Sequence, residues 1–190
     1  GARRAGAGKL RIIGGKYRSR VLRFSVRPGL RPTPDRVRET LFNWLGQDLS
    51  GWRCLDAFAG SGALGFEAAS RGAAEVLLLD RDAELVASLQ ATKQRLKADV
   101  VRIERADAIA WLARAQVGSF DLVLIDCPPS LGLLTVNAFA AASEVMVPIQ
   151  CEYYALEGLG QLLRNVALVQ QNINSGLRLS GIVMTMFDPR

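Results

Sequence analysis

The stretch RCLDAFAGSGALGFEAASRG (residues 53–72) decides the fold, because it passes from a strand pattern to a helix pattern through one tight turn. Residues 53–58 predict a buried strand that brings Asp56 to its end. A Gly-Ser-Gly turn follows at residues 60–62, and residues 62–72 predict a helix. Glycines let a backbone come close to a ligand, and a helix N-terminus offers free N–H groups. We therefore expect a ligand site at this strand end.

Outward from this stretch, short apolar strands and amphipathic helices alternate along the rest of the sequence. The further strands are expected at residues 75–80, 100–105, 120–126, 144–149 and 180–187, and the helices at residues 83–96, 107–115, 133–142 and 155–171. Continuous apolar strands joined by helices indicate a mostly parallel sheet with helices on both faces. The sequence therefore predicts an α/β fold with a doubly wound sheet, as a single domain over residues 31–190 after a basic tail and hairpin over residues 1–30.

The composition narrows the class of protein. With 190 residues, 49% of them hydrophobic, the chain is long enough for one domain with a packed core. It has no apolar run of the roughly 18 residues that span a bilayer and no signal peptide, and it begins with Gly1 rather than Met, so we expect a processed or trimmed form. Three scattered Cys and no His argue against a disulfide framework, a metal site and His-based catalysis. A reducing, cytoplasmic compartment is expected.

The positive charge is concentrated at the N-terminus. Residues 1–40 contain 12 Lys/Arg and 2 Asp/Glu, whereas the whole chain contains 24 and 18. Within this region LRIIGGKYRSRVLRF (residues 10–24) predicts a β-hairpin that carries basic side chains on both sides of a Gly-Gly-Lys turn. A basic arm of this kind is typical of nucleic-acid contact, and the alternative is a solvated tail.

A helix is expected within RPTPDRVRETLFNWL (residues 31–45), where Thr33 or Asp35 can cap the N-terminus. Apolar residues at helical spacing are expected in the core, namely Val37, Leu41, Trp44 and Leu45. Three basic residues are then free to face a ligand, namely Arg31, Arg36 and Arg38.

Acidic residues stand at three successive strand ends: Asp56, Asp80 and Asp107. Asp80 follows Gly62 by 18 residues, close to the roughly 20 that separate a glycine turn from a carboxylate that accepts ribose hydroxyls. Each Asp alone could equally cap the helix that follows it. Three of them along one sheet edge favour a nucleoside site.

LDAFAGSGALG (residues 55–65) resembles motif I of class I S-adenosylmethionine (SAM) methyltransferases, which are Rossmann-like. Over residues 9–126, and especially in LRIIGGKYRSRVL and GLRPTPDRVRETLFNWL, the chain resembles the RsmD family of bacterial methyltransferases. The resemblance implies SAM as cofactor, and methyl transfer to the exocyclic N2 of a guanine in small-subunit ribosomal RNA. The partner would be ribosomal RNA or the small ribosomal subunit, and we expect a monomer.

The same resemblance implies the site residues. Cofactor contacts would come from Asp56, Phe58, Gly60, Ser61, Gly62, Asp80, Asp107 and Ala108. RNA contacts would come from Arg11, Lys16, Arg18, Arg20, Arg31, Thr33 and Arg36.

LVLIDCPPSLGLL (residues 122–134) resembles the Asp-Pro-Pro-aromatic loop with which amino-group methyltransferases bind the target amine. The resemblance gives the catalytic role to Asp126, Pro128 and Pro129. In this chain Cys127 separates the Asp from the prolines, and Ser130 replaces the aromatic residue. We therefore expect methyl transfer to be weak or absent.

Residues 121–190 resemble ParA/Soj-type chromosome-partitioning ATPases. The phosphate loop of that family is missing: AGAGKL (residues 5–10) has Leu10 in place of Ser/Thr and no strand before it, which favours a solvated tail. The sequence thus predicts a chimera of two families joined near residues 120–126. The alternatives are a ParA-like ATPase or partition fragment, a chimera without enzymatic activity, and a non-catalytic RNA-binding domain.

Overall fold

The computed structural model describes residues 7–25, 32–116, 118–125, 136, 139–140, 142–150 and 155–185. The chain divides into two compact units, residues 1–126 and residues 127–190. Each unit has its own sheet and its own hydrophobic cluster. The single domain expected over residues 31–190 stays a prediction.

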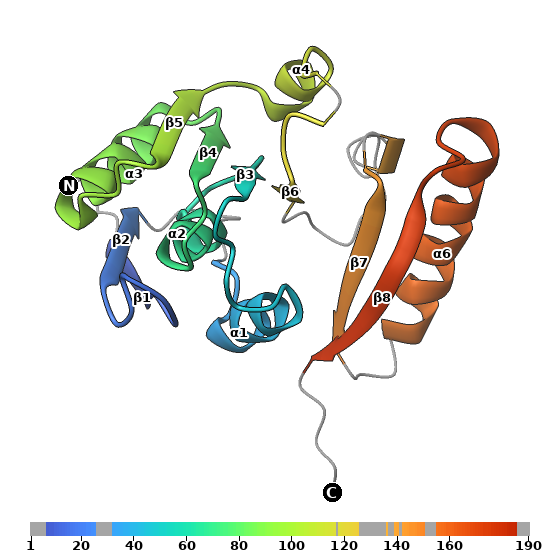
Figure 1. Cartoon of the computed structure of the whole chain (residues 1–190), viewed down its shortest axis with the longest axis horizontal. Coiled ribbons are helices and arrows are strands. Elements are labelled where there is room, and N and C mark those ends of the chain that lie inside the picture. The colour runs from blue at the N-terminus through green and yellow to red at the C-terminus, as the bar shows by residue number, and fades with distance from the viewer. Residues whose placement is uncertain are drawn as a thin grey trace, which may run out of the picture. The chain divides into compact units, whose positions relative to one another are not determined.

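The first unit is built on a four-stranded parallel sheet (Figure 1). Its strands are β3 (Arg53–Asp56), β4 (Glu75–Asp80), β5 (Val101–Arg105) and β6 (Leu122–Leu124). Their order across the sheet is β5-β4-β3-β6, so the chain moves outward from β3 to β5 and then returns to the other side of β3. This confirms the predicted doubly wound α/β fold, with strand ends displaced by a few residues.

Helices cover both faces of this sheet. They are α1 (Asp35–Trp44), α2 (Ala63–Ser70), α3 (Ala83–Leu96) and α4 (Ala108–Leu112). Along β4 successive side chains enter different cores: Val76 and Leu78 join one hydrophobic cluster, whereas Leu77 and Leu79 join another. A strand with two buried faces has this apolar run because neither side meets water.

The N-terminal hairpin is part of the first unit's core. It consists of β1 (Ala7–Arg11) and β2 (Val21–Ser25), which are antiparallel. Leu10 and Leu22 face each other across the pair, and both are buried in the cluster that holds α2 and α3. The predicted hairpin is confirmed, but the expectation of a solvated tail up to residue 10 is wrong from Ala7 onward. A folded loop of residues 12–20 joins the strands, in place of a short Gly-Gly-Lys turn.

Helix α1 differs from its predicted orientation. Pro34 is the N-cap residue and no side chain caps the helix, so neither Thr33 nor Asp35 has that role. Phe42 is fully buried, but Trp44 is 50% exposed, which contradicts its predicted place in the core. The buried face of α1 is therefore centred on Phe42. The spacing of the apolar residues had placed that face at Trp44.

The second unit pairs β7 (Glu144–Gln150) with β8 (Arg178–Thr185) in parallel, and α6 (Ala155–Asn172) connects them. Its cluster of buried side chains comprises Phe139, Val145, Val147, Val166, Val169 and Leu177. The Asn174 amide donates to the carbonyls of Phe139, Ala140 and Ala142, which ties the turn between α6 and β8 to the segment before β7. The helix expected at residues 133–142 falls largely outside the described residues. Within the described part of the chain, no helix is long and apolar enough to cross a membrane.

Candidate functional site

The carboxyl edge of the four-stranded sheet has a topological switch point. From β3 the chain proceeds to β4 on one side, and β6 is placed on the other. Ligands of open α/β sheets bind in the crevice outside the strand ends at such a point. The residues at and after these strand ends therefore form the candidate site.

The glycine turn after β3 adopts a conformation that suits glycine alone. Gly60 has a φ of 52° and Gly62 a φ of 77°, both in the left-handed region. A Cβ at residue 62 would lie 2.6 Å from Leu89 and 2.7 Å from Phe66. The turn leads directly into α2, whose first N–H groups have no partners within the helix. Backbone donors are thereby presented at the sheet edge.

Asp80 joins this turn to the end of β4. One of its carboxylate oxygens accepts a hydrogen bond from the Gly60 N–H at 2.9 Å, and the other accepts from the Asp82 N–H at 2.9 Å. The side chain is half-buried. An ionised carboxylate offers about four acceptor positions, so two hydrogen bonds leave capacity for ligand hydroxyls.

Asp56 occupies a deeper position. It is 2% exposed, and its Oδ2 accepts from the Gly65 N–H at 3.0 Å. A Cβ at Gly65 would lie 2.0 Å from Leu78, so helix and strand approach closely here. Asp56 therefore holds the first turn of α2 against β3. Ser61 is also buried, and Phe58 is half-buried against the cluster around Leu55.

Asp107 follows β5 as expected, and it caps α4. Its Oδ1 accepts from the Ala110 N–H at 2.9 Å, and the side chain is exposed. Ala108 begins α4, where a backbone N–H has no partner within the helix. The Ala106 N–H donates to the Asp80 carbonyl at 3.0 Å, which ties the ends of β4 and β5 together.

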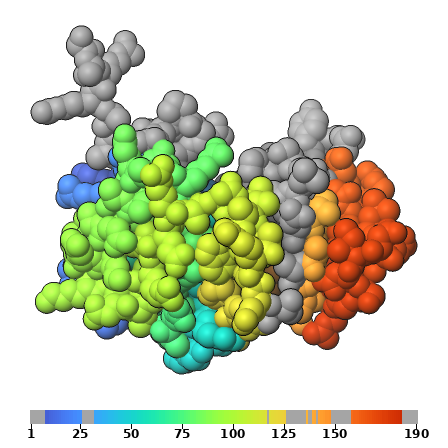
Figure 2. Space-filling model, turned by 90° about the horizontal axis from the view of Figure 1, so that it is seen from above, coloured from blue at the N-terminus to red at the C-terminus, as the bar shows by residue number. Residues whose placement is uncertain are grey.

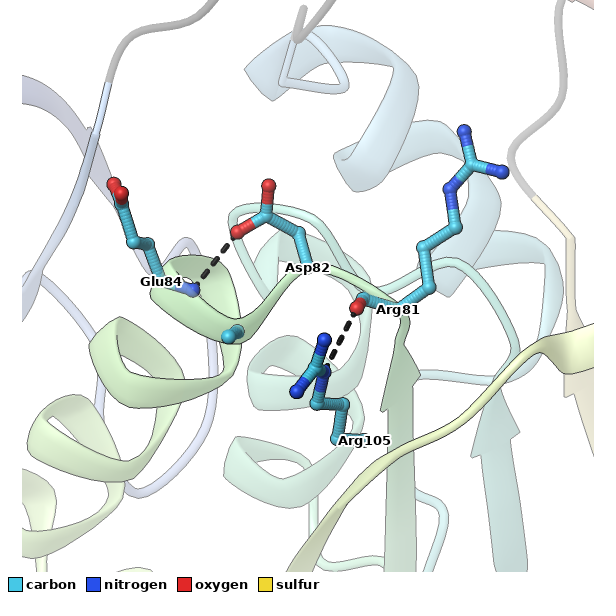
Figure 3. Close-up of a pocket in the computed structure, with 5 residues that line it drawn as sticks. Arg81, Asp82, Glu84 and Arg105 are labelled. Atoms are coloured by element: carbon cyan, nitrogen blue, oxygen red, sulfur yellow. Dashed lines mark hydrogen bonds between the residues drawn. The ribbon is translucent and has the colours of Figure 1, made fainter.

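An open hollow of about 460 Å³ lies beside these strand ends. Its lining residues are Arg81, Asp82, Ala83, Glu84 and Arg105 (Figure 3). Arg105 Nε donates to the Arg81 carbonyl at 3.1 Å, while the Arg81 side chain extends away from the other labelled groups (Figure 3). Motif comparison missed these residues, although Arg81 directly follows Asp80 and Arg105 ends β5. Their position after two strand ends is the signal that could have identified them.

Figure 2 views the molecule from above, the direction in which the β4 arrow points in Figure 1. Residues coloured green to yellow, which include α3, β5 and α4, form most of the surface of the first unit in this view (Figure 2). This surface therefore includes elements that flank the glycine turn and the hollow.

The candidate RNA-binding residues fall into two groups. Four are exposed on the hairpin and its loop: Arg11, Lys16, Arg18 and Arg20. Arg36 is exposed in the first turn of α1, and Thr33, just before it, is half-buried. Arg31 lies outside the described residues. The ammonium of Lys16 lies 5.5 Å above the Tyr17 ring, which leaves the charge at the surface.

Arg38 is not free to face a ligand, and that prediction is wrong. Its side chain is fully buried and forms an ion pair of 3.2 Å with the fully buried Glu67 of α2. It also donates to the carbonyls of Thr33 and Arg11 and pairs with Asp35. A buried guanidinium needs such partners because an uncompensated charge inside a protein is costly.

The three residues to which the resemblance gave the catalytic role, Asp126, Pro128 and Pro129, lie outside the described residues, as do Cys127 and Ser130. Cys54 is buried in β3, and burial, with a smaller effect from Asp121, raises the pKa of its thiol to about 12. It is thus an inert core residue at neutral pH. Among the described residues, no group of three or more His, Cys, Asp or Glu side chains could hold a metal ion.

Comparison with known proteins gives several matches to one family over most of the chain. The family model described as conserved hypothetical protein 95 matches residues 10–153. Ribosomal RNA small subunit methyltransferase D of Escherichia coli (strain K12) is 43% identical over 155 residues, which are 78% of this chain and 77% of that protein. The same-named protein of Buchnera aphidicola is 40% identical over 131 residues, 68% of this chain and 69% of that protein.

Solved structures agree with the observed fold. The Escherichia coli protein yhhF is 48% identical with a TM-score of 0.57, covering 67% of this chain and 70% of that chain. A hypothetical protein of Thermus thermophilus is 32% identical with a TM-score of 0.60, covering 70% of this chain and 78% of that chain. The first unit thus has the α/β fold of class I SAM methyltransferases, with an added antiparallel hairpin.

A second set of matches is partial. Chromosome partitioning protein ParA of Myxococcus xanthus is 57% identical over 77 residues, 40% of this chain and 27% of that protein. Soj of Bacillus subtilis is 51% identical over 90 residues, and the chain spans only 33% of its length. The Escherichia coli methyltransferase matches 78% of this chain and the ParA protein matches 40% of it. These two shares add up to more than the whole chain, so the two matches overlap. The first match also extends to residue 153, beyond the expected limit of 126. The chain belongs to the RsmD/Cons_hypoth95 methyltransferase family.

Proposed function

We propose that this protein is a SAM-dependent methyltransferase that acts on the exocyclic N2 of a guanine in small-subunit ribosomal RNA. One observation carries the proposal: the Gly60 N–H and the Asp80 carboxylate meet at 2.9 Å on the carboxyl edge of the sheet, beside the switch point. That contact brings a glycine turn and a ribose-type acceptor together, as a nucleoside cofactor requires. The name and the 43% identity of the Escherichia coli relative support the substrate class.

The residues present fit SAM. Asp80 keeps acceptor positions for ribose hydroxyls, and Gly60 and Gly62 adopt the left-handed backbone of the tight turn without strain. Asp107 and the Ala108 N–H at the start of α4 would bind the adenine edge. Asp56 supports the first turn of α2 through its bond to the Gly65 N–H, Phe58 packs against the cluster around Leu55, and Ser61 is buried. The cofactor supplies an electrophilic methyl group, and the protein's own groups orient the acceptor.

On the substrate side, the amine of guanine is a poor nucleophile because its lone pair is conjugated with the ring. A carboxylate and a carbonyl that accept hydrogen bonds from its N–H groups can hold the nitrogen in line with the methyl group. In this proposal Asp126, with the backbone beside Pro128 and Pro129, has that role. The base would be turned out of its stack to reach the loop.

We further propose that the loop is impaired and that the C-terminal segment derives from a ParA/Soj-type sequence. Cys127 adds one residue between the carboxylate and the prolines, and Ser130 offers no stacking face. The 57% identity to a partitioning protein over 77 residues supports this origin. The protein would then bind SAM well and transfer methyl groups slowly.

The runner-up is a ParA-like ATPase. One observation speaks against it: Gly8 and Lys9, the nearest match to a phosphate loop, lie in β1 and pair with Phe24 and Arg23 of β2. A phosphate loop has to follow a strand and open a helix so that its N–H groups surround the phosphates. Residues 8 and 9 instead lie within a strand.

Parallel calorimetric titrations with SAM and with ATP plus Mg²⁺ test the proposal on the full chain. We expect saturable heat with SAM and none with ATP. Binding of ATP, together with hydrolysis that Asp126→Ala abolishes, would replace the proposal with the ATPase. RNA binding by a folded protein that shows no heat with SAM would instead support a non-catalytic RNA-binding domain.

A further inference from the structure

We propose that Glu67 and Ser70 of α2 are positioning residues for RNA binding. They hold the loop of residues 12–20 in a conformation that aligns its exposed cations for phosphate contact. The inference rests on the proposed function, because it takes RNA as the ligand. It assigns a role to two side chains that themselves touch neither RNA nor cofactor.

The loop is bound to α2 through its backbone. Both oxygens of the buried Glu67 carboxylate accept from the loop, from the Ile13 N–H at 3.0 Å and from the Gly14 N–H at 2.9 Å. Ser70 Oγ accepts from the Tyr17 N–H at 2.8 Å and donates to the Gly14 carbonyl. The C-terminal half of α2 therefore holds the loop at Ile13, Gly14 and Tyr17.

Close packing leaves little freedom at this contact. Gly15 has a φ of 74°, and a Cβ there would lie 1.8 Å from the Ser70 carbonyl oxygen. The Lys16 N–H donates to the same oxygen at 2.7 Å. Inside the loop, the Ser19 N–H donates to the Ile12 carbonyl at 2.8 Å. The loop is thus a compact structure docked on the helix.

The charges on the two sides of the loop differ. On the inner side, Arg38 and Arg71 neutralise the Glu67 carboxylate. On the outer side, three exposed cations point to solvent: Lys16, Arg18 and Arg20. Residues 7–25 contain no acidic residue, so nothing within the hairpin balances these charges. Like charges repel, and a polyanion such as an RNA backbone offsets that repulsion.

The docking site also links this loop to the glycine turn. Helix α2 begins just after Gly62 and ends at Ser70, and eight residues of helix span about 12 Å. The loop cations are therefore held at the opposite end of the helix that starts at the proposed cofactor turn. A loop ordered in advance also binds RNA without a further loss of conformational entropy.

Strand β2 of the hairpin has separate anchors on α3. Ser88 Oγ donates to the Arg23 carbonyl at 3.0 Å, and Arg95 Nη2 donates to the Val21 carbonyl at 3.0 Å. Loss of the Ser70 hydroxyl should therefore loosen the loop and leave β1 and β2 in place. This makes the docking contact testable by itself.

The test compares RNA affinity at several salt concentrations, with an unmethylated small-subunit rRNA transcript as probe. Ser70→Ala removes the hydroxyl contacts, and Gly15→Ala forces the loop away from α2. Gly51→Ala is the matched control, because its φ of 83° imposes the same backbone strain with nothing within 4 Å of the new Cβ. A triple variant with Ala at the three loop cations, residues 16, 18 and 20, gives the reference slope. Urea denaturation of every variant identifies those that are fully folded under assay conditions.

Each phosphate contact contributes about 0.7–0.9 to the slope of log affinity against log salt concentration. We expect the triple variant to flatten the slope, and both docking variants to flatten it similarly although every cation remains. Their affinity should fall on the order of tenfold, while Gly51→Ala stays unchanged. A purely structural role would lower the folded fraction and leave the slope unaltered.

An unchanged slope in Ser70→Ala and Gly15→Ala, beside a flattened slope in the triple variant, would overturn the inference, since the cations would then bind without docking. An unchanged slope in the triple variant would also overturn it, because the loop would not contact RNA. Neither result affects SAM binding, so a failure here is distinct from a failure of the proposed cofactor site.

Discussion

Arg38 Nη1 donates to Glu67 Oε2 at 3.2 Å, and both side chains are fully buried. Through this pair the start of α1 and the end of β1 are joined to α2, because Arg38 also donates to the Thr33 and Arg11 carbonyls. Two segments with candidate RNA-binding residues thus share one buried guanidinium. The glycine turn precedes the helix that carries its partner.

Breaking this pair should be costly. Arg38→Met leaves the buried Glu67 carboxylate without one of its two guanidinium partners, and removing one partner of a buried pair costs about 3–5 kcal/mol. Urea denaturation measures the loss. Arg53→Met is the control, because the Arg53–Asp121 pair is exposed and water screens it. Equal losses in the two variants would contradict the structural role given to Arg38.

The hairpin should stabilise the first unit as part of its core. Leu22 is fully buried, so Leu22→Ala should lower the free energy of unfolding by about 2–5 kcal/mol. Ile109→Ala, at a largely exposed position on α4, should cost about 0.5 kcal/mol or less. A Leu22→Ala variant as stable as the parent would show that the hairpin is detachable. Deletion of residues 1–24 would then disrupt the core, because it removes the buried Leu10 and Leu22. Substitution of exposed cations therefore tests RNA binding without this loss of stability.

The agreement between sequence and structure has a physical basis. β4 and α3 have the predicted bounds, because an apolar run and a capped amphipathic pattern are local signals. The burial of Arg38 was not predictable in this way, since its partner Glu67 is 29 residues away on another helix. Asp80 shows both cases: its place at a strand end follows from the sequence, whereas its bond to the Gly60 N–H requires the fold.

The Cys54 thiol should make stability depend on pH in the alkaline range. Burial, and secondarily the charge of Asp121, raises its pKa from 9.0 to about 12. The unfolded chain ionises this thiol first, so its stabilising contribution is complete below pH 9 and is lost as the pH rises toward 12. Urea denaturation across this range should show a steeper loss in the parent than in Cys54→Ala. Parallel pH profiles of the two proteins would contradict the raised pKa.

The catalytic loop should be repairable. Deletion of Cys127 together with Ser130→Phe restores the Asp-Pro-Pro-aromatic order, and methyl transfer to unmethylated small-subunit rRNA should rise about a hundredfold or more. A displacement near 1 Å and the loss of base stacking, worth roughly 1–3 kcal/mol, account for that size. Radioactive methyl incorporation measures the rate. Equal rates before and after the repair would show that the loop tolerates the insertion.

SAM binding at Asp80 is the central claim, and calorimetry on the parent protein, Asp80→Ala and Asp121→Ala tests it most directly. Asp121 is the matched control, because it is an exposed Asp that pairs with Arg53 where β3 begins, at the other edge of the sheet. We predict saturable SAM binding by the parent, a loss of about 1.5–3 kcal/mol in Asp80→Ala, or roughly ten- to a hundredfold, and a much smaller change in Asp121→Ala. A folded parent without SAM binding, or an Asp80→Ala variant with the parent's affinity, would contradict the account.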